Sequence, residues 1–159
     1  MDTKTLTDVL REHPFLEGLK PNYIQKLAEV ALEVQFARDQ LIFREGDESS
    51  LFYLLASGKV ALEISAPGKI VRIQTLGEGD EMGWSSLLGE GSGKTFQARS
   101  LEPVRAIAFD AARLRQVWSQ DPAFGYEFIR RLLRVVAQRL QATRLQLLDL
   151  YAPRGVKLV

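Results

Sequence analysis

The sequence predicts a mainly β domain, a closed antiparallel roll or sandwich, with short helices before it and a long helix after it. Apolar residues repeat with helical spacing at both ends of the chain and alternate with period two in the middle. Turn-forming residues recur through that middle part at intervals of about ten residues. The 159 residues are enough for one domain with a substantial core.

Residues 1–33 are expected to form a pair of short helices. Apolar side chains recur at helical spacing on either side of an interruption at Pro14 and Gly18. The second helix is expected to begin at Pro21, because proline at the first helical position has no N–H to leave unpaired. His13, the sole histidine, is expected at the surface or as a helix cap.

Residues 34–109 change to a period of two, which is typical of half-buried strands. The clearest segments are 60–64 and 71–75, where apolar and polar side chains alternate. Stretches rich in Gly, Pro and Asp separate such segments and predict turns. These stretches lie at 45–47, 57–59, 66–69, 77–80 and 89–93.

Residues 110–151 are expected to be helical and to leave a short tail at 152–159. Asp110 is a suitable cap for a first helix. Asp121, followed by a proline, is expected to begin a second, long helix that ends near Tyr151.

A heptad pattern runs along this long helix. Its apolar positions are spaced alternately by four and three residues and are interrupted only by Thr143. The pattern favours a parallel homodimer, and the alternative is packing on the chain's own roll, for which a second apolar row is available. The heptad seam comprises Ile129, Leu133, Val136, Leu140, Thr143, Leu147 and Leu150, and the second row comprises Leu132, Val135, Leu145 and Leu148.

The charges are distributed unevenly, although the net charge is only +1. Residues 1–109 carry 12 Lys and Arg against 16 Asp and Glu, whereas residues 110–159 carry 9 against 4. Such asymmetry sometimes marks nucleic-acid binding. The arginines of the long helix are better explained by a solvated helix face, so we expect no contact with DNA.

Neither a membrane contact nor export is expected. No window approaches about 18 consecutive apolar residues, and the first residues lack the basic and apolar regions of a signal peptide. The sequence therefore predicts a cytoplasmic protein.

No catalytic residues, metal site or cofactor are expected. With no cysteine and one histidine, zinc sites and Ser/His/Asp triads lack their parts. The stretch 89–95 ends like a phosphate-binding P-loop, but Leu88 stands where that motif requires glycine. Residues 77–83 miss the dinucleotide-binding fingerprint by one residue. The sequence predicts a protein that is not an enzyme.

Several strings resemble the cyclic-nucleotide-binding domain of catabolite activator protein-like bacterial regulators, over nearly the whole chain. They are PFLEGL at 14–19, IFREGD at 42–47, FYLLASGKV at 52–60, LGEGD at 76–80 and RLQAT at 139–143, the last of which resembles the family's central dimer helix. The resemblance implies an antiparallel β-roll of jelly-roll (double-stranded β-helix) type, a ligand cassette at 83–95 and a dimerising helix. A relative's DNA-reading helix-turn-helix domain would begin about where this sequence stops, so a stand-alone regulatory domain is expected.

The resemblance also implies the ligand-binding residues. Gly83 and Thr95 match the family pattern. Trp84 stands where relatives have a glutamate that accepts a hydrogen bond from the ribose, and an indole has only an N–H donor. Lys94 stands where relatives have an arginine that binds the cyclic phosphate, and it keeps the charge without the fork of two donors. Each loss is expected to cost about 1–3 kcal/mol, so that cyclic nucleotide binding weakens roughly 10²- to 10⁴-fold.

Two hypotheses about function follow. In the first, the pocket binds a small phosphate-bearing ligand, a cyclic nucleotide such as cAMP or cGMP or another anion. Lys94 then supplies charge, while Ser85, Ser86 and the cassette amides supply donors. Thr143, on the dimer helix, then responds to whether the pocket holds a ligand. In the second, the pocket is degenerate, Trp84 fills it as core, and the chain is a dimeric protein–protein interaction module. A downstream protein partner suits either hypothesis.

Overall fold

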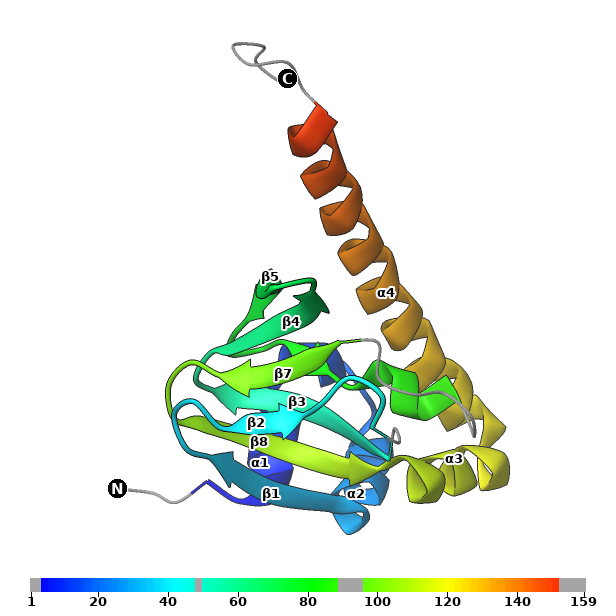
Figure 1. Ribbon diagram of the computed structural model, residues 1–159. Coiled ribbons are helices and arrows are strands. Elements are labelled where there is room, and N and C mark those ends of the chain that lie inside the picture. Colours follow the sequence, from blue (N-terminus) through cyan, green and yellow to red (C-terminus); the bar gives the residue numbers. More distant parts are fainter. Residues whose placement is uncertain (1–3, 48–49, 89–95, 152–159) are drawn as a thin grey trace.

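Two four-stranded antiparallel sheets form the centre of the protein, with strand orders β1-β8-β3-β6 and β2-β7-β4-β5. Helix α4 runs along one side of them and continues beyond β4 and β5 (Figure 1). The computed structural model describes residues 4–47, 50–88 and 96–151. The elements are α1 (Leu6–Glu12), η1 (Pro14–Leu16), α2 (Pro21–Glu29), β1 (Ala31–Phe36), β2 (Leu41–Phe43), β3 (Leu51–Ser57), β4 (Val60–Ala66), β5 (Lys69–Leu76), β6 (Glu81–Met82), η2 (Trp84–Leu88), β7 (Gln97–Ser100), β8 (Val104–Asp110), α3 (Ala111–Gln120) and α4 (Pro122–Tyr151).

The sheet that contains β3 and β8 is buried on both faces. Phe52 and Leu54 of β3 pack with the helices, whereas Tyr53 and Leu55 pack between the two sheets. This alternation follows from the geometry of a strand, whose successive side chains point to opposite faces. One sheet therefore separates two cores, which we call the helical cluster and the roll interior.

Each core is defined by its buried apolar residues. The helical cluster comprises Leu10, Phe15, Leu16, Tyr23, Ile24, Leu27, Phe52, Leu54, Leu87, Ile107, Phe109, Ala111, Leu114, Phe124, Phe128, Leu132 and Val135. The roll interior comprises Phe43, Tyr53, Leu55, Val60, Leu62, Leu76, Met82, Ala98, Val104, Ala106 and Ala108.

Phe128 holds the first half of α4 in the helical cluster. Its ring centroid lies 5.1 Å from that of Phe15, 5.9 Å from that of Phe52 and 5.1 Å from that of Trp118. Edge-on and tilted aromatic pairs of this kind each add about 0.5–1.5 kcal/mol to the stabilisation from burial. Elements η1, β3 and α3 thus meet α4 at one side chain.

The fold class expected from the sequence is confirmed, including the caps of the C-terminal helices. The Asp110 carboxylate accepts a hydrogen bond from the Arg113 N–H at 3.1 Å, and the Asp121 carboxylate accepts one from the Phe124 N–H at 3.2 Å. The N-terminal helical region is shorter than expected. Strand β1 already begins at Ala31, because its pairing with β8 overrides the local helical pattern.

His13 caps a helix, which is one of the two positions expected for it, and it is buried instead of lying at the surface. Its Nδ1 accepts the Phe15 N–H at 3.1 Å at the start of η1, and its Nε2 lies 3.1 Å from the Leu55 carbonyl oxygen. Because Nδ1 accepts, Nε2 carries the proton and donates to Leu55. The residue is buried, and this burial lowers the pKa of His13 despite the hydrogen bond to Leu55.

The turn between β3 and β4 requires glycine at position 58. Gly58 has a φ of +91°, and a Cβ there would lie 2.4 Å from the Pro103 carbonyl oxygen. Gly68 also has a positive φ, +77°, with nothing within 4 Å of a Cβ. We expect Gly68→Ala to cost about 1–2 kcal/mol for the left-handed backbone alone. Gly58→Ala should cost about 1–3 kcal/mol more because of the clash. Urea unfolding measures both, and equal losses would show that the close approach to Pro103 is absent.

The stability of the protein should fall in mild acid through His13. Its folded pKa lies below the ordinary value of 6.5, so above that pH both states are neutral and His13 adds no pH dependence. As the pH falls below about 6.5, the unfolded chain takes up a proton more readily than the folded chain, and the free energy of unfolding decreases. Between about pH 7 and pH 5.5, chemical unfolding should therefore show a larger loss in wild type than in His13→Gln. Parallel curves for the two proteins would contradict this.

Candidate ligand site

A tight turn follows β6 and forms the start of the cassette. Gly83 is buried and has a φ of +80°, a conformation that glycine adopts without strain. Its carbonyl oxygen accepts two hydrogen bonds from Ser86, one from the N–H at 3.0 Å and one from the hydroxyl at 2.6 Å. Ser86 is fully buried, so these two bonds close the turn on itself.

Arg115 of α3 fixes the far end of this turn. Its Nη1 donates to the Ser86 carbonyl oxygen at 2.7 Å. Arg115 was not predicted from the sequence, because an arginine in a helix of mixed polarity is indistinguishable from one on a solvated face. The turn from Gly83 to Ser86 is therefore held by a helix that begins after the last strand of the roll.

Trp84 packs toward the helices. Its half-buried side chain contacts the helical cluster, to which Leu87 also belongs, and it is not among the residues of the roll interior. Ser85, between Trp84 and Ser86, is half-buried as well. The apolar side of η2 thus faces the helical cluster.

A buried ion pair ties the strand before the cassette to α4. The Arg139 Nη2 donates to the main-chain oxygen of Glu81 and lies 3.2 Å from its Oε1. The two side chains are only 14% and 11% exposed. Burial raises the pKa of Glu81, although the Arg139 charge opposes this, and burial lowers the pKa of Arg139, opposed by Glu81. Neither residue was singled out from the sequence as part of the site.

Thr143 lies one helical turn beyond Arg139. It is exposed, and its hydroxyl donates to the Arg139 carbonyl oxygen at 3.0 Å. The structure thus brings Gly83, Trp84, Ser85 and Ser86 into one turn and connects Thr143 to that region through Arg139 and Glu81. Lys94 and Thr95 lie outside the described residues.

The side of α4 that faces the roll differs from the expected second row. Leu132 and Val135 are buried, as that row predicted, but Leu145 and Leu148 are 53% and 54% exposed, so this part of the expectation is wrong. Gln146 faces the roll instead, and its Nε2 donates to the Ile73 carbonyl oxygen of β5 at 2.8 Å. Beyond Val135 the main-chain oxygens of Glu81 and Ile73 face the helix. These oxygens need hydrogen-bond donors, so polar side chains of α4 lie opposite them.

The heptad seam is a surface of the single chain. Five of its residues, Ile129, Leu133, Leu140, Leu147 and Leu150, are between 44% and 79% exposed, and Val136 is half-buried. Within the described segments no helix combines the length and the apolar content needed to cross a membrane.

Comparison with known proteins agrees with this geometry. The family model of the cyclic nucleotide-binding domain matches residues 33–121. The CRP-like cAMP-activated global transcriptional regulators of two Mycobacterium tuberculosis strains are each 32% identical over 146 residues, which cover 91% of this chain. The chain spans 63% of the length of these curated relatives.

Solved structures with the same fold include two bacterial regulators. The N-terminal domain of a transcriptional regulator from Streptomyces coelicolor A3(2) is 26% identical, with a TM-score of 0.68 over 82% of this chain and 94% of that one. The catabolite activator protein of Thermus thermophilus is 26% identical, with a TM-score of 0.70 over 86% of this chain and 62% of that one. Because the family model matches more than half of the sequence and the fold is the same, the chain belongs to the cyclic nucleotide-binding domain family.

Proposed function

We propose that this domain is a non-enzymatic sensor, which binds a small phosphate-bearing ligand at the cassette of residues 83–95 and reports its occupancy through α4. The placement of Trp84 carries the proposal. A degenerate pocket filled by Trp84 requires the indole in the roll interior, whereas the indole packs against the helical cluster. Trp84 therefore does not fill the interior side of the turn at Gly83, which favours the ligand-binding hypothesis.

The cassette supplies donors for an anion. Lys94 provides the charge, and the main chain near Gly83 and Ser85 provides polar groups. Ser86 has a structural role instead, because its buried hydroxyl already donates a hydrogen bond to the Gly83 carbonyl oxygen and so stabilises the turn. The Mycobacterium tuberculosis relatives are named as cAMP-activated, and cAMP is therefore the first ligand to test. Affinity should be weak, since Trp84 cannot accept a hydrogen bond from a ribose hydroxyl.

Homodimerisation through α4 completes the sensor. The heptad seam presents apolar side chains at the spacing of a parallel coiled coil, and five of them are exposed in the single chain. A second copy that covers this seam removes that apolar area from water. A structural change caused by ligand binding at the cassette is then transmitted to the partner subunit through α4, the helix that carries Arg139 and Thr143.

The competing function, a dimeric module that binds another protein, rests on a separate observation. Leu145 and Leu148 are exposed and lie outside the heptad seam, so dimerisation leaves them uncovered. Apolar side chains that remain exposed after assembly are typical of a surface for a further partner.

We expect the wild-type protein to be a dimer at micromolar concentration. Leu140→Lys places a charge in the seam and should produce monomers, because a lysine in a coiled-coil core is strongly unfavourable. Leu148→Lys is the matched control, since Leu148 is similarly exposed but outside the seam. Sedimentation velocity distinguishes the states. A monomeric wild type, or the same sedimentation behaviour for both variants, would rule out this interface.

The cassette is tested by restoring the family's two ligand-recognising side chains. The double variant Trp84→Glu, Lys94→Arg should bind cAMP roughly 10²- to 10⁴-fold more tightly than wild type, measured by titration calorimetry. Lys94→Ala should abolish ligand binding and leave the fold nearly unchanged, because a lysine that serves an anion contributes little to packing.

The opposite pattern identifies a degenerate pocket. In that case the folded double variant binds cAMP no more tightly than wild type, and Lys94→Ala changes neither binding nor stability. Only Trp84→Ala then lowers the stability. Its cost would be about 3–5 kcal/mol of stability if the indole were buried core. Thermal unfolding of each variant establishes that it is folded before binding is compared.

A further inference from the structure

A cavity of about 480 Å³ lies between α1 and the sheet that contains β1, β8 and β3. Its walls come from α1, from these three strands and from the turn before β6, and no described residue of the cassette lines it. Small-molecule sites in proteins have volumes of roughly 300–1,000 Å³. The cavity is therefore large enough for a ligand of its own.

The cavity forms where the helical cluster stops covering the sheet. Ile107 belongs to that cluster and is buried. Its cross-strand partner is Glu33, and Arg105 pairs with Gln35 one step farther along the same two strands. These four side chains share one face of the sheet, because opposite residues and alternate residues point to the same side. Glu33, Gln35 and Arg105 are exposed, so the face changes there from apolar to charged.

One wall of the cavity is fixed by hydrogen bonds. The Leu55 carbonyl oxygen of β3 accepts from His13 Nε2 at 3.1 Å and from the Gly79 N–H at 3.1 Å. Gly79 also packs closely on Pro14, since a Cβ at this glycine would lie 3.2 Å from the Pro14 Cγ. The end of α1, the strand and the turn are thus held together, and the cavity is formed before any ligand binds.

The charges around the cavity leave one carboxylate without a counter-charge. Glu12 of α1 lies 2.6 Å from the Lys4 Nζ, and Glu33 of β1 lies 4.0 Å from the Arg105 Nη2. Glu78, in the turn before β6, lines the cavity and forms no ion pair with any described residue. Three carboxylates on three walls therefore face two cations, which favours a positively charged ligand.

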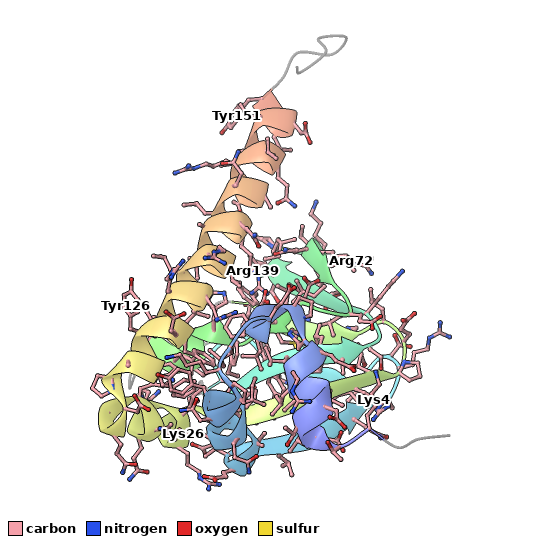
Figure 2. The ribbon with its side chains drawn as sticks, turned by 180° about the vertical axis from the view of Figure 1, so that it is seen from behind. Lys4, Lys26, Arg72, Tyr126, Arg139 and Tyr151 are labelled. Carbon is pink, nitrogen blue, oxygen red and sulfur yellow. The ribbon has the colours of Figure 1, made fainter. Side chains whose placement is uncertain are left out.

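Lys4 shows which kind of cation this place accommodates. Figure 2 shows Lys4 beside α1. The pKa of Lys4 is raised, mainly by its hydrogen bond to Glu12 and by the charge of Glu12, and further by the charges of Asp8 and Glu78. An ammonium on an aliphatic chain is thus already stabilised at the mouth of the cavity. Each side chain of the Lys4–Glu12 and Arg105–Glu33 pairs is more than half exposed, and ion pairs of this kind contribute little to stability. An incoming amine can replace them.

We propose that this cavity is a second ligand site, which binds a linear polyamine. The inference does not rest on the proposed function. Ammonium groups of the ligand pair with Glu12, Glu33 and Glu78, and its methylene chain lies against apolar lining side chains such as Val9 and Ile107. An anion would add to the excess negative charge, and a zwitterion would leave it unbalanced. A chain with several separated ammonium groups matches carboxylates that come from different walls.

The site is tested by calorimetric titration of the full chain with spermidine, in the absence of cAMP and at constant ionic strength. Butylamine, which carries a single ammonium, should bind at least 10-fold more weakly. Mg²⁺ at the concentration of spermidine should not displace it, because a compact ion makes no contact with the apolar lining.

Two variants should shift the affinity for spermidine in opposite directions. Glu78→Gln should lower it about 10-fold, the value of one hydrogen bond to a charged group. Lys4→Gln should raise it several-fold, because the ammonium that competes for Glu12 is removed. Glu17→Gln and Lys20→Gln are the matched controls, since they make the same changes in net charge at exposed residues that do not line the cavity. Both controls should leave the affinity unchanged.

Several results would overturn the inference. One is the absence of spermidine binding to wild type at millimolar concentration. Another is equal effects of Glu78→Gln and Glu17→Gln, which would show that spermidine responds only to the net charge of the protein. Displacement by Mg²⁺, or binding of butylamine as tight as that of spermidine, would reduce the cavity to an acidic surface. All substituted residues are exposed, and thermal unfolding confirms that each variant is folded. Whether the cassette binds cAMP has no bearing on these results.

Discussion

The alternation of side chains in β3 is the constraint on which the rest of the structure depends. Phe52 and Leu54 serve the helical cluster, while Tyr53 and Leu55 serve the roll interior. Because one sheet supplies both cores, neither the helices nor the second sheet can be packed independently of it. The ligand cassette begins where β6 leaves the edge of this sheet, so its position is set by the same strand pairings.

The cassette combines a local turn with contacts from helices that follow much later in the chain. Gly83 and Ser86 close the turn by themselves, but Arg115 holds its end and Arg139 holds the strand before it. The shape of the site therefore depends on the positions of α3 and α4. This dependence is reciprocal, since a ligand that favours one shape of the turn also favours one position of the helices.

Local patterns were sufficient to predict the fold class, and distant contacts were not predictable from them. The period of two in residues 60–64 and the caps at Asp110 and Asp121 depend on neighbouring residues only, so the sequence displays them directly. Glu81 and Arg139 are 58 residues apart, and nothing in either local pattern distinguishes them from solvated charges. The burial of His13 was missed for the same reason, because its partner Leu55 belongs to another element. Residues that matched a family motif were found, and residues that act through tertiary contacts were not.

Helix α4 is divided into two parts that are held by different forces. Its first half is embedded in the helical cluster through Phe128, Leu132 and Val135. Beyond these residues Arg139 and Gln146 make polar contacts with the roll, and the five leucines of this part are exposed. Shifting an embedded helix exposes apolar area, whereas exchanging one polar partner for another costs little when the new partner is equally good. The proposed report of occupancy through α4 therefore needs to shift only the second half of the helix, while the first half stays packed in the helical cluster.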